Sequence, residues 1–264
     1  MGGNKQTKKA NSRLRKVGSQ LITIVCLAVF IYSAYALYSS FMDYYQNRQV
    51  LAEAQEIFYE IPNEEEKELD ELKEGEIRLQ FQELQGVNAD IVGWISIEDT
   101  QLNYPILQST NNNDYLNRNY KGENSMAGSV FMDYRIDITS YSPNTILYGH
   151  RMKDGSMFDG LKKFLDQDFF DNHKVVKFDT LYESYDAEIF SVYQTTTDFD
   201  YIQTDFTSEE DYELLLHEIQ EKSEYPTDTV LNAEDQIITL STCDYKLNPN
   251  TGRLVVHAKL VKKG

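Results

Sequence analysis

The sequence predicts a mainly β domain with helices, either a barrel or a sandwich, placed behind an N-terminal membrane anchor. From residue 91 onward, short apolar runs alternate with turn signals at regular intervals, which is typical of all-β barrels and sandwiches. Between residues 43 and 84, in contrast, apolar residues recur among charged ones at loosely helical spacing. The first forty residues contain a long uncharged stretch that follows several basic residues, which is typical of a membrane anchor.

The N-terminal anchor is predicted at residues 17–38, where 22 consecutive residues carry no charge. A helix needs about 20 mostly apolar residues to cross the hydrocarbon core of a bilayer. Six basic residues and no acidic one precede this stretch, so we expect residues 1–16 to form a cytoplasmic tail and the remainder to face outward. The alternative is a cleaved signal peptide, whose apolar region would span only about 7–15 residues. Residues 38–42 also make a poor cleavage site.

Charge and composition narrow the possible partners. The chain has 25 basic and 43 acidic residues, and its formal net charge is −18. Nucleic acids favour basic patches on the proteins that bind them, so we expect no nucleic-acid partner. An acidic surface instead keeps an exported domain soluble. The chain contains no D-x-[DN]-x-[DN]-G loop, so its acidic residues predict a solvated face rather than a calcium site.

Residues 39–75 are predicted to form an extracellular helical stalk, and residues 76–264 the folded domain. Pro62 marks a break in the stalk, and Gly75 separates its second helix from one that follows. Pro105 argues against a central position for the strand that contains it. Strands are predicted near residues 92–97, 102–107, 128–133, 144–149, 175–178, 187–193, 236–242 and 253–261, and helices over 157–165 and 209–222.

Cys243 occupies the most informative position in the chain. The sequence has two cysteines, and Cys26 lies within the predicted anchor, so Cys243 is the one thiol of the folded domain. It directly follows the predicted strand 236–242. An unpaired extracellular cysteine indicates either intermolecular pairing or a reactive nucleophile. The alternative is a small buried apolar side chain, which is the usual role of a free cysteine.

A cysteine nucleophile needs a base within reach. The chain has four histidines, and three of them, His173, His217 and His257, are predicted to be surface or structural residues because they lie in a turn, a helix and a strand. His150 differs because it follows a strand that ends at Gly149 and precedes a polar loop. A histidine at such an exit is held rigidly and still reaches solvent, although a structural role fits this position equally well.

Arg253 is the candidate for stabilising negative charge on a reacting group. It begins the last predicted strand, after a loop over residues 244–252. If the strands on either side of this loop pair as a hairpin, Arg253 and Cys243 are neighbours. A guanidinium is a fixed cation with several donors, which suits a tetrahedral oxyanion. The alternative is a solvated arginine at the end of a strand.

The arrangement of these residues resembles that of the sortases. The chain contains Tyr148-Gly-His150, then Thr239-Leu-Ser-Thr-Cys243, and then Arg253 ten residues later. Class B sortases in particular are similar to the stretch 144–158 and to the segments Val92-Gly-Trp-Ile, Tyr104-Pro-Ile and Gly128-Ser-Val-Phe-Met-Asp. The similarity covers residues 76–264. It implies a sortase-type eight-stranded β-barrel with N-terminal helices and an additional helix before the late strands.

The resemblance implies a membrane-anchored cysteine transpeptidase. Such an enzyme cleaves a C-terminal sorting signal after threonine, forms a thioacyl intermediate and passes the protein to an amine of a cell-wall peptidoglycan precursor or of a pilin lysine. By resemblance, Cys243 attacks, His150 acts as general acid and then base, and Arg253 steadies the substrate or the oxyanion. Surface proteins or pilins with sorting signals are the implied substrates, and neither a metal nor an organic cofactor is implied.

The resemblance also implies substrate contacts near these three residues. Asn112 and Leu116, four residues apart, match a substrate-contacting helix of class B sortases. Ser241 and Thr242 directly precede Cys243 and are expected from this position to line the substrate groove.

Two other functions stay open at this stage. An anchored cysteine protease or hydrolase of the papain type would also use a cysteine and a histidine, but that family places the cysteine before the histidine in the chain. A non-catalytic surface adhesin or receptor on a barrel scaffold would leave Cys243 inert. Labelling with a polar alkylating reagent distinguishes the adhesin or receptor from the enzymes, because a buried inert thiol resists the reagent under native conditions.

Overall fold

The computed structural model describes residues 3–60, 75–140 and 142–263. It divides into two compact units, Met1–Gln46 and Asn47–Gly264, and helix α1 (Gly3–Tyr59) contributes to both. Among the described residues, one helical segment is long and apolar enough to cross a membrane: Gly18–Tyr59 includes an 18-residue window with a mean hydropathy of 2.1, none of it buried. The predicted second stalk helix lies largely in residues 61–74, outside the described residues.

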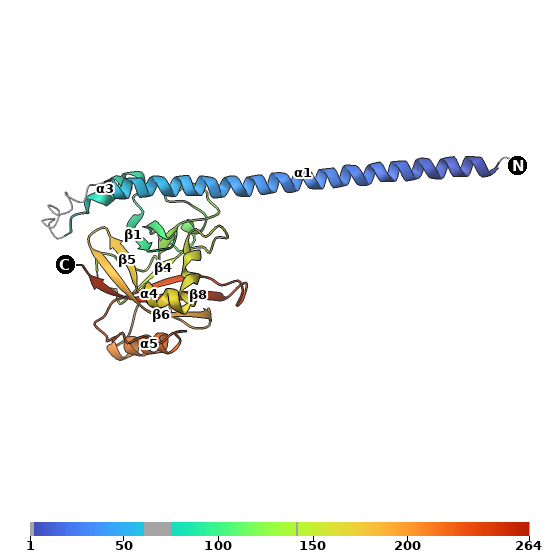
Figure 1. Ribbon diagram of the computed structural model, residues 1–264. Coiled ribbons are helices and arrows are strands. Elements are labelled where there is room, and N and C mark those ends of the chain that lie inside the picture. The colour runs from blue at the N-terminus through green and yellow to red at the C-terminus, as the bar shows by residue number, and fades with distance from the viewer. Residues whose placement is uncertain (1–2, 61–74, 141, 264) are drawn as a thin grey trace. The chain divides into compact units, whose positions relative to one another are not determined.

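The second unit is a closed barrel of eight strands (Figure 1). Their order around the barrel is β1-β2-β3-β4-β7-β8-β6-β5. Neighbouring strands are antiparallel, except for the parallel pairs β2–β3 and β4–β7. The eight-stranded barrel that the resemblance implies is therefore confirmed. The strands are β1 (Ile91–Ile97), β2 (Asn103–Leu107), β3 (Val130–Met132), β4 (Asn144–Tyr148), β5 (Val175–Thr180), β6 (Ser184–Thr196), β7 (Ile237–Cys243) and β8 (Gly252–Lys262).

Pro105 lies in a strand that is paired on both sides, whereas the sequence argued against a central position for it. On β2, Pro105 stands opposite Trp94 of β1, and the ladder with β3 begins one residue later at Ile106. The proline therefore stands outside the β3 ladder, so its missing N–H leaves that ladder intact.

Both faces of β8 are covered. Leu254, Val256 and Ala258 point into the barrel and are fully buried in its core, as the period of two along a strand predicts. Val255 points to the other side and is buried in a second cluster with helix α5 (Glu209–Glu221) and residues of β6 and β7. The additional helix expected before the late strands is thus confirmed, and it covers the outside of this part of the barrel (Figure 1).

The helix predicted over residues 157–165 is a 3-10 helix, η3 (Phe158–Leu165). Its apolar side chains Phe158, Leu161 and Phe164 are fully buried in the barrel core. The spacing that predicted an amphipathic helix therefore identified the buried face correctly, although the turns are tighter than those of an α-helix. The other short helices are α3 (Leu79–Val87), η2 (Asp114–Leu116) and α4 (Gln167–Asn172).

The C-terminal part of α1 packs onto the barrel. Leu51, Ala54 and Phe58 are buried, and the Phe58 ring stacks on Trp94 of β1 with the ring centroids 4.1 Å apart. The region expected to form a stalk therefore contributes side chains to the folded unit, which begins at Asn47.

Candidate active site

The hairpin of β7 and β8 places Arg253 directly opposite Cys243. The connection between the strands is closed by three backbone hydrogen bonds: Asp244 N to Gly252 O (2.9 Å), Asn248 N to Asp244 O (3.2 Å) and Gly252 N to Asn248 O (3.0 Å). A Cβ atom on Gly252 would lie 2.2 Å from the Asp244 carbonyl oxygen, so this tight connection requires glycine there. The neighbouring positions expected from the sequence are therefore found.

The parallel pairing of β4 with β7 brings His150 to the same edge of the sheet as Cys243. The Thr242 hydroxyl donates to the Gly149 carbonyl oxygen at 2.7 Å, which ties the last residue before each candidate to the other strand. Parallel neighbours run in the same direction, so His150 and Cys243 leave the sheet side by side. Cys243 is thus flanked by the strand of His150 on one side and by Arg253 on the other.

The hydrogen bonds of His150 determine which ring nitrogen carries its proton. Nε2 lies 2.8 Å from the carbonyl oxygen of Leu116, and a carbonyl only accepts, so Nε2 is the protonated donor. Nδ1 has no hydrogen-bond partner among the described residues, and it is the nitrogen available to exchange a proton. The backbone is held as well, because the Phe158 amide donates to the His150 carbonyl at 2.9 Å.

The Arg253 guanidinium folds back onto its own loop. Nη1 donates to the Gly252 carbonyl at 2.8 Å and to the Asn250 carbonyl at 3.5 Å. Within the part of the chain that the structure describes, no carboxylate pairs with Arg253, and neither Nε nor Nη2 has a partner. The cation is therefore oriented by the loop while two of its nitrogens stay available as donors.

Two tyrosines that the sequence gave no reason to select lie in the field of Cys243 and Arg253. Burial raises the pKa of Tyr201, although a hydrogen bond with Ser241 (2.8 Å) and the charge of Arg253 partly offset this. Tyr245 is 56% exposed, and its partial burial raises its pKa, which the Cys243 side chain raises further. Both phenols therefore stay neutral near pH 7. Tyr201 is far from Cys243 in sequence, so only the fold reveals this proximity.

Ser241 and Thr242, expected to line the groove, are buried residues of β7. Their exposed fractions are 3% and 2%. The hydroxyl of Ser241 is bonded to Tyr201, and that of Thr242 to the Gly149 carbonyl. The structure thus places both beside Cys243 as its supporting floor.

Asn112 lies two residues before the 3-10 helix η2, and Leu116 is its last residue. The Leu116 carbonyl holds His150, as described above. The Asn112 amide donates to the Asp133 carboxylate at 2.9 Å and accepts from the Tyr134 amide at 3.0 Å. The structure therefore brings Leu116 directly to the candidate base, while Asn112 contacts Asp133 and Tyr134 instead.

Comparison with known proteins assigns this arrangement to a family. Residues 95–261 match the Sortase domain. The chain belongs to the sortase family. It is 40% identical to sortase B of Listeria monocytogenes and 37% identical to sortase B of Staphylococcus aureus, in each case over 242 residues that cover 92% of this chain and 96% of the relative. Sortases are cysteine transpeptidases, so the enzyme class expected from the sequence is confirmed, and a papain-type hydrolase or an inert adhesin is not favoured.

Solved sortase B structures share the fold. A Bacillus anthracis sortase B matches with a TM-score of 0.76 and 57% identity, covering 84% of this chain and 100% of that chain. A Staphylococcus aureus sortase B-substrate complex matches with a TM-score of 0.74 and 40% identity, again over 84% of this chain and 100% of that chain.

Asp133 and Arg135, which sequence reasoning missed, form a cluster of hydrogen bonds that reaches Tyr148, two residues before His150. The fully buried Asp133 carboxylate accepts two bonds of 2.8 Å from Arg135 and bonds of 2.9 Å from Tyr148 and Asn112. Burial alone would raise the pKa of Asp133, but these bonds, led by those of Arg135, lower it. Arg135 also donates to the Ile202 carbonyl at 3.0 Å. An Asp and an Arg two residues apart in a loop give no periodic signal, so the sequence does not reveal this hydrogen-bonded cluster.

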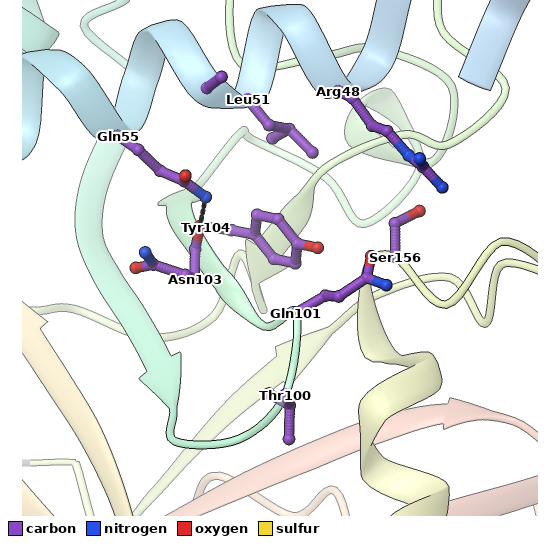
Figure 2. Close-up of a pocket in the computed structure, with 9 residues that line it drawn as sticks. Arg48, Leu51, Gln55, Thr100, Gln101, Asn103, Tyr104 and Ser156 are labelled. Carbon is purple, nitrogen blue, oxygen red and sulfur yellow. Dashed lines mark hydrogen bonds between the residues drawn. The ribbon is translucent and has the colours of Figure 1, made fainter. Parts of the chain in front are cut away.

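A cavity of about 360 Å³ lies elsewhere on this sortase, between α1 and the start of β2 (Figure 2). The Tyr104 ring lies between the α1 side chains and Ser156, and Gln55 donates to the Asn103 carbonyl at 2.9 Å (Figure 2). None of the candidate catalytic residues lines this cavity. Its lining residues are Arg48, Leu51, Ala52, Gln55, Thr100, Gln101, Asn103, Tyr104 and Ser156.

Among the residues that the structure describes, no cluster of three or more His, Cys, Asp or Glu is arranged to hold a metal ion.

Proposed function

We propose that this sortase cleaves a C-terminal sorting signal after threonine and transfers the new carboxyl end to an amine of a cell-wall precursor or of a pilin lysine. The observation that carries the proposal is the position of Cys243, flanked by the strand of His150 and by Arg253 at one edge of the barrel. The related Staphylococcus aureus sortase B, solved as a substrate complex, supports a surface-protein substrate.

In the first half-reaction, the Cys243 sulfur attacks the threonine carbonyl carbon. The thiol proton passes to the free Nδ1 of His150, and the carbonyl oxygen becomes an oxyanion. The available donors of Arg253 stabilise this oxyanion. Cleavage of the C–N bond follows, and His150 returns the proton to the leaving amine. The product is a thioester between Cys243 and threonine.

The second half-reaction reverses these roles. The acceptor amine attacks the thioester carbonyl, and His150 removes a proton from it. The C–S bond breaks, the Cys243 sulfur regains a proton from His150, and a new amide bond is complete. Every proton and electron pair is accounted for by these groups, and the step needs no added oxidant or cofactor.

The sorting signal is proposed to lie along the η2 turn and the end of β7. Asn112 and Leu116 then form one side of the groove, and Ser241 and Thr242 lie under its floor. Because both hydroxyls are already bonded within the barrel, their contribution is to hold Cys243 in place rather than to bind the peptide directly.

The membrane topology is proposed from residues 17–38 and the six basic residues before them. The tail over residues 1–16 then stays in the cytoplasm, and residues 39–264 lie outside the cell membrane. Protease added to cells without a wall should digest the folded domain and spare a short N-terminal fragment. Protection of the domain in intact protoplasts would contradict this orientation.

The central test uses full-length protein in detergent with a sorting-signal peptide. Wild-type protein should give a thioacyl adduct, visible by mass spectrometry as a mass increase on Cys243, and an amide product once an amine acceptor is added. Cys243→Ala should form neither, while its stability falls by no more than about 1–2 kcal/mol. Cys26→Ala is the matched control and should keep full activity. Turnover by Cys243→Ala, or hydrolysis without amide formation at any acceptor concentration, would contradict the proposed transfer.

A further inference from the structure

The residues that directly follow His150 and Cys243 form an ion pair with each other. Arg151 Nη1 lies 3.3 Å from Asp244 Oδ1. The Asp244 side chain is fully buried, and that of Arg151 is 16% exposed. Each partner is joined by one peptide unit to a candidate catalytic residue, so this pair ties together the two segments that must exchange a proton.

The Asp244 carboxylate has a complete set of partners. Besides Arg151, it accepts from the Lys246 amide at 3.0 Å and from the Gln194 side chain. Burial alone would raise the pKa of Asp244, but the hydrogen bonds from Gln194 and the backbone, together with the charge of Arg151, lower it. The carboxylate is therefore a buried anion that Arg151 neutralises. Such an anion loses much of its stabilisation when its cation is removed.

Each partner also holds the loop in which it lies. The Asp244 backbone closes the connection that sets Arg253 opposite Cys243, through the bonds to Asn248 and Gly252 described above. Arg151 forms an isolated β-bridge with Met157, and its Nε lies 3.4 Å from Asp159 Oδ1. One side of the pair thus shapes the β7–β8 connection, and the other shapes the loop over residues 150–158.

We propose that Arg151 and Asp244 are a positioning pair that holds the His150 loop against the Cys243–Arg253 hairpin at the separation needed for proton transfer. This inference rests on the catalytic roles proposed above for His150 and Cys243. Neither member of the pair is assigned a contact with substrate, and both act through the residue that precedes them. A shift of about 1 Å at a reacting centre costs about a hundredfold in rate, so a loosened pair should slow the chemistry more than it weakens peptide binding.

The test compares Arg151→Met and Asp244→Asn with Arg78→Met, in full-length protein in detergent. Arg78 is a matched control, because it forms an ion pair of 2.7 Å with Asp179, with side chains 19% and 15% exposed, away from the catalytic residues. Arg151→Met and Asp244→Asn should each lower kcat for a sorting-signal peptide by about tenfold or more and change KM by less than about threefold. Arg78→Met should leave kcat within about twofold of wild type. The double variant Arg151→Met/Asp244→Asn should be no slower than the slower single variant, because the two residues act as one unit.

Arg151→Lys keeps the test decisive where Arg151→Met folds poorly. Lysine keeps the charge but cannot reach Asp244 and Asp159 from one planar fork, so kcat should still fall while the melting temperature stays near that of wild type. Wild-type kcat in Arg151→Lys and Asp244→Asn, with Cys243→Ala inactive, would overturn the positioning pair alone. An equal loss of kcat in Arg78→Met would overturn it too, because a general loss of stability would then explain the effect. Turnover by Cys243→Ala would instead contradict the proposed function.

Discussion

His150 and His257 flank the same strand, β7, yet only His150 keeps a ring nitrogen free. His257 on β8 is fully buried, with Nδ1 2.8 Å from the Thr239 hydroxyl and Nε2 2.8 Å from the Tyr193 hydroxyl. Thr239 donates its own proton to the side-chain oxygen Oδ1 of Asn144 at 2.6 Å, so it must accept from Nδ1 of His257. Tyr193 then donates to Nε2, and both nitrogens of His257 are satisfied.

This difference is the one expected between a structural histidine and the histidine proposed to be catalytic. Burial lowers the pKa of His257 to about 3, so it stays neutral near pH 7, and neither of its ring nitrogens is open to take up a proton. His150 has the opposite tautomer, with Nε2 donating to a backbone carbonyl and Nδ1 open. In His257 both nitrogens are hydrogen-bonded, which stabilises the barrel core. In His150 one nitrogen is bonded, which orients the ring and leaves the other nitrogen open. We therefore expect substitutions at the edge with His150 to change activity, and substitutions in the core with His257 to change stability.

The largest expected effect is on activity at the edge. His150→Gln should lower the rate of thioacyl formation by about 10²–10⁴-fold, because glutamine cannot accept and return the proton. The melting temperature should change no more than it does for a typical surface substitution, because the variant alters only the hydrogen bond to the Leu116 carbonyl. Single-turnover acylation followed by mass spectrometry measures the rate. His217→Gln, on the exposed surface of α5, is the control and should acylate like wild type.

The next effect tests whether Arg253 acts on the oxyanion. Arg253→Lys keeps a positive charge but loses the planar arrangement of donors, and it should slow acylation by about 10²–10³-fold. Its KM for a sorting-signal peptide should change far less than its kcat. Wild-type acylation rates in both Arg253→Lys and Arg253→Ala would reduce the site to a cysteine and a histidine.

The edge of the barrel was more predictable from sequence than the contacts that support it. Cys243, His150 and Arg253 each lie at the end or the start of a strand, where apolar alternation meets loop residues. Chain order and the loop over residues 244–252 were enough to predict that Cys243 and Arg253 are neighbours. That His150 joins them depends on the parallel pairing of β4 with β7, which local patterns do not encode. The resemblance pointed to His150 without that pairing.

The supporting contacts could not be predicted because they join residues far apart in the chain. Arg151 meets Asp244 across 93 residues, and Arg135 meets the Ile202 carbonyl across 67. A single charged residue in a loop has no periodic pattern that indicates its partner. Pro105 shows a different limit, because the rule against a proline in a central strand takes no account of register. The β3 ladder begins at Ile106, one residue after the proline.

In the core, the expected effect is on stability and its pH dependence. His257→Gln should lower the free energy of unfolding by about 2–4 kcal/mol at pH 7, because two buried hydroxyls lose their fitted partner. His257 has a pKa of about 3 when folded against 6.5 ordinarily, so only the unfolded chain gains its proton in between. Wild-type stability should therefore fall as pH falls from about 6 to 4, by up to about 1.4 kcal/mol per pH unit from this group. The variant should lack that contribution in urea unfolding curves across this range. An unchanged slope would contradict the buried neutral histidine.

The smallest effect distinguishes the two regions most finely. Tyr193→Phe removes one buried hydroxyl, the donor to Nε2 of His257, and should cost about 1 kcal/mol without slowing acylation. Tyr201→Phe is the matched variant, since it also removes one buried hydroxyl, but the partner Ser241 lies two residues before Cys243. We expect urea unfolding to show a similar loss of stability in both variants. Acylation should be slower in Tyr201→Phe and unchanged in Tyr193→Phe. If both variants acylate at the wild-type rate, the active-site edge does not depend on the hydrogen bond between Tyr201 and Ser241. Slower acylation in Tyr193→Phe at unchanged stability would show that the His257 network reaches the active site and that the two regions are not separable.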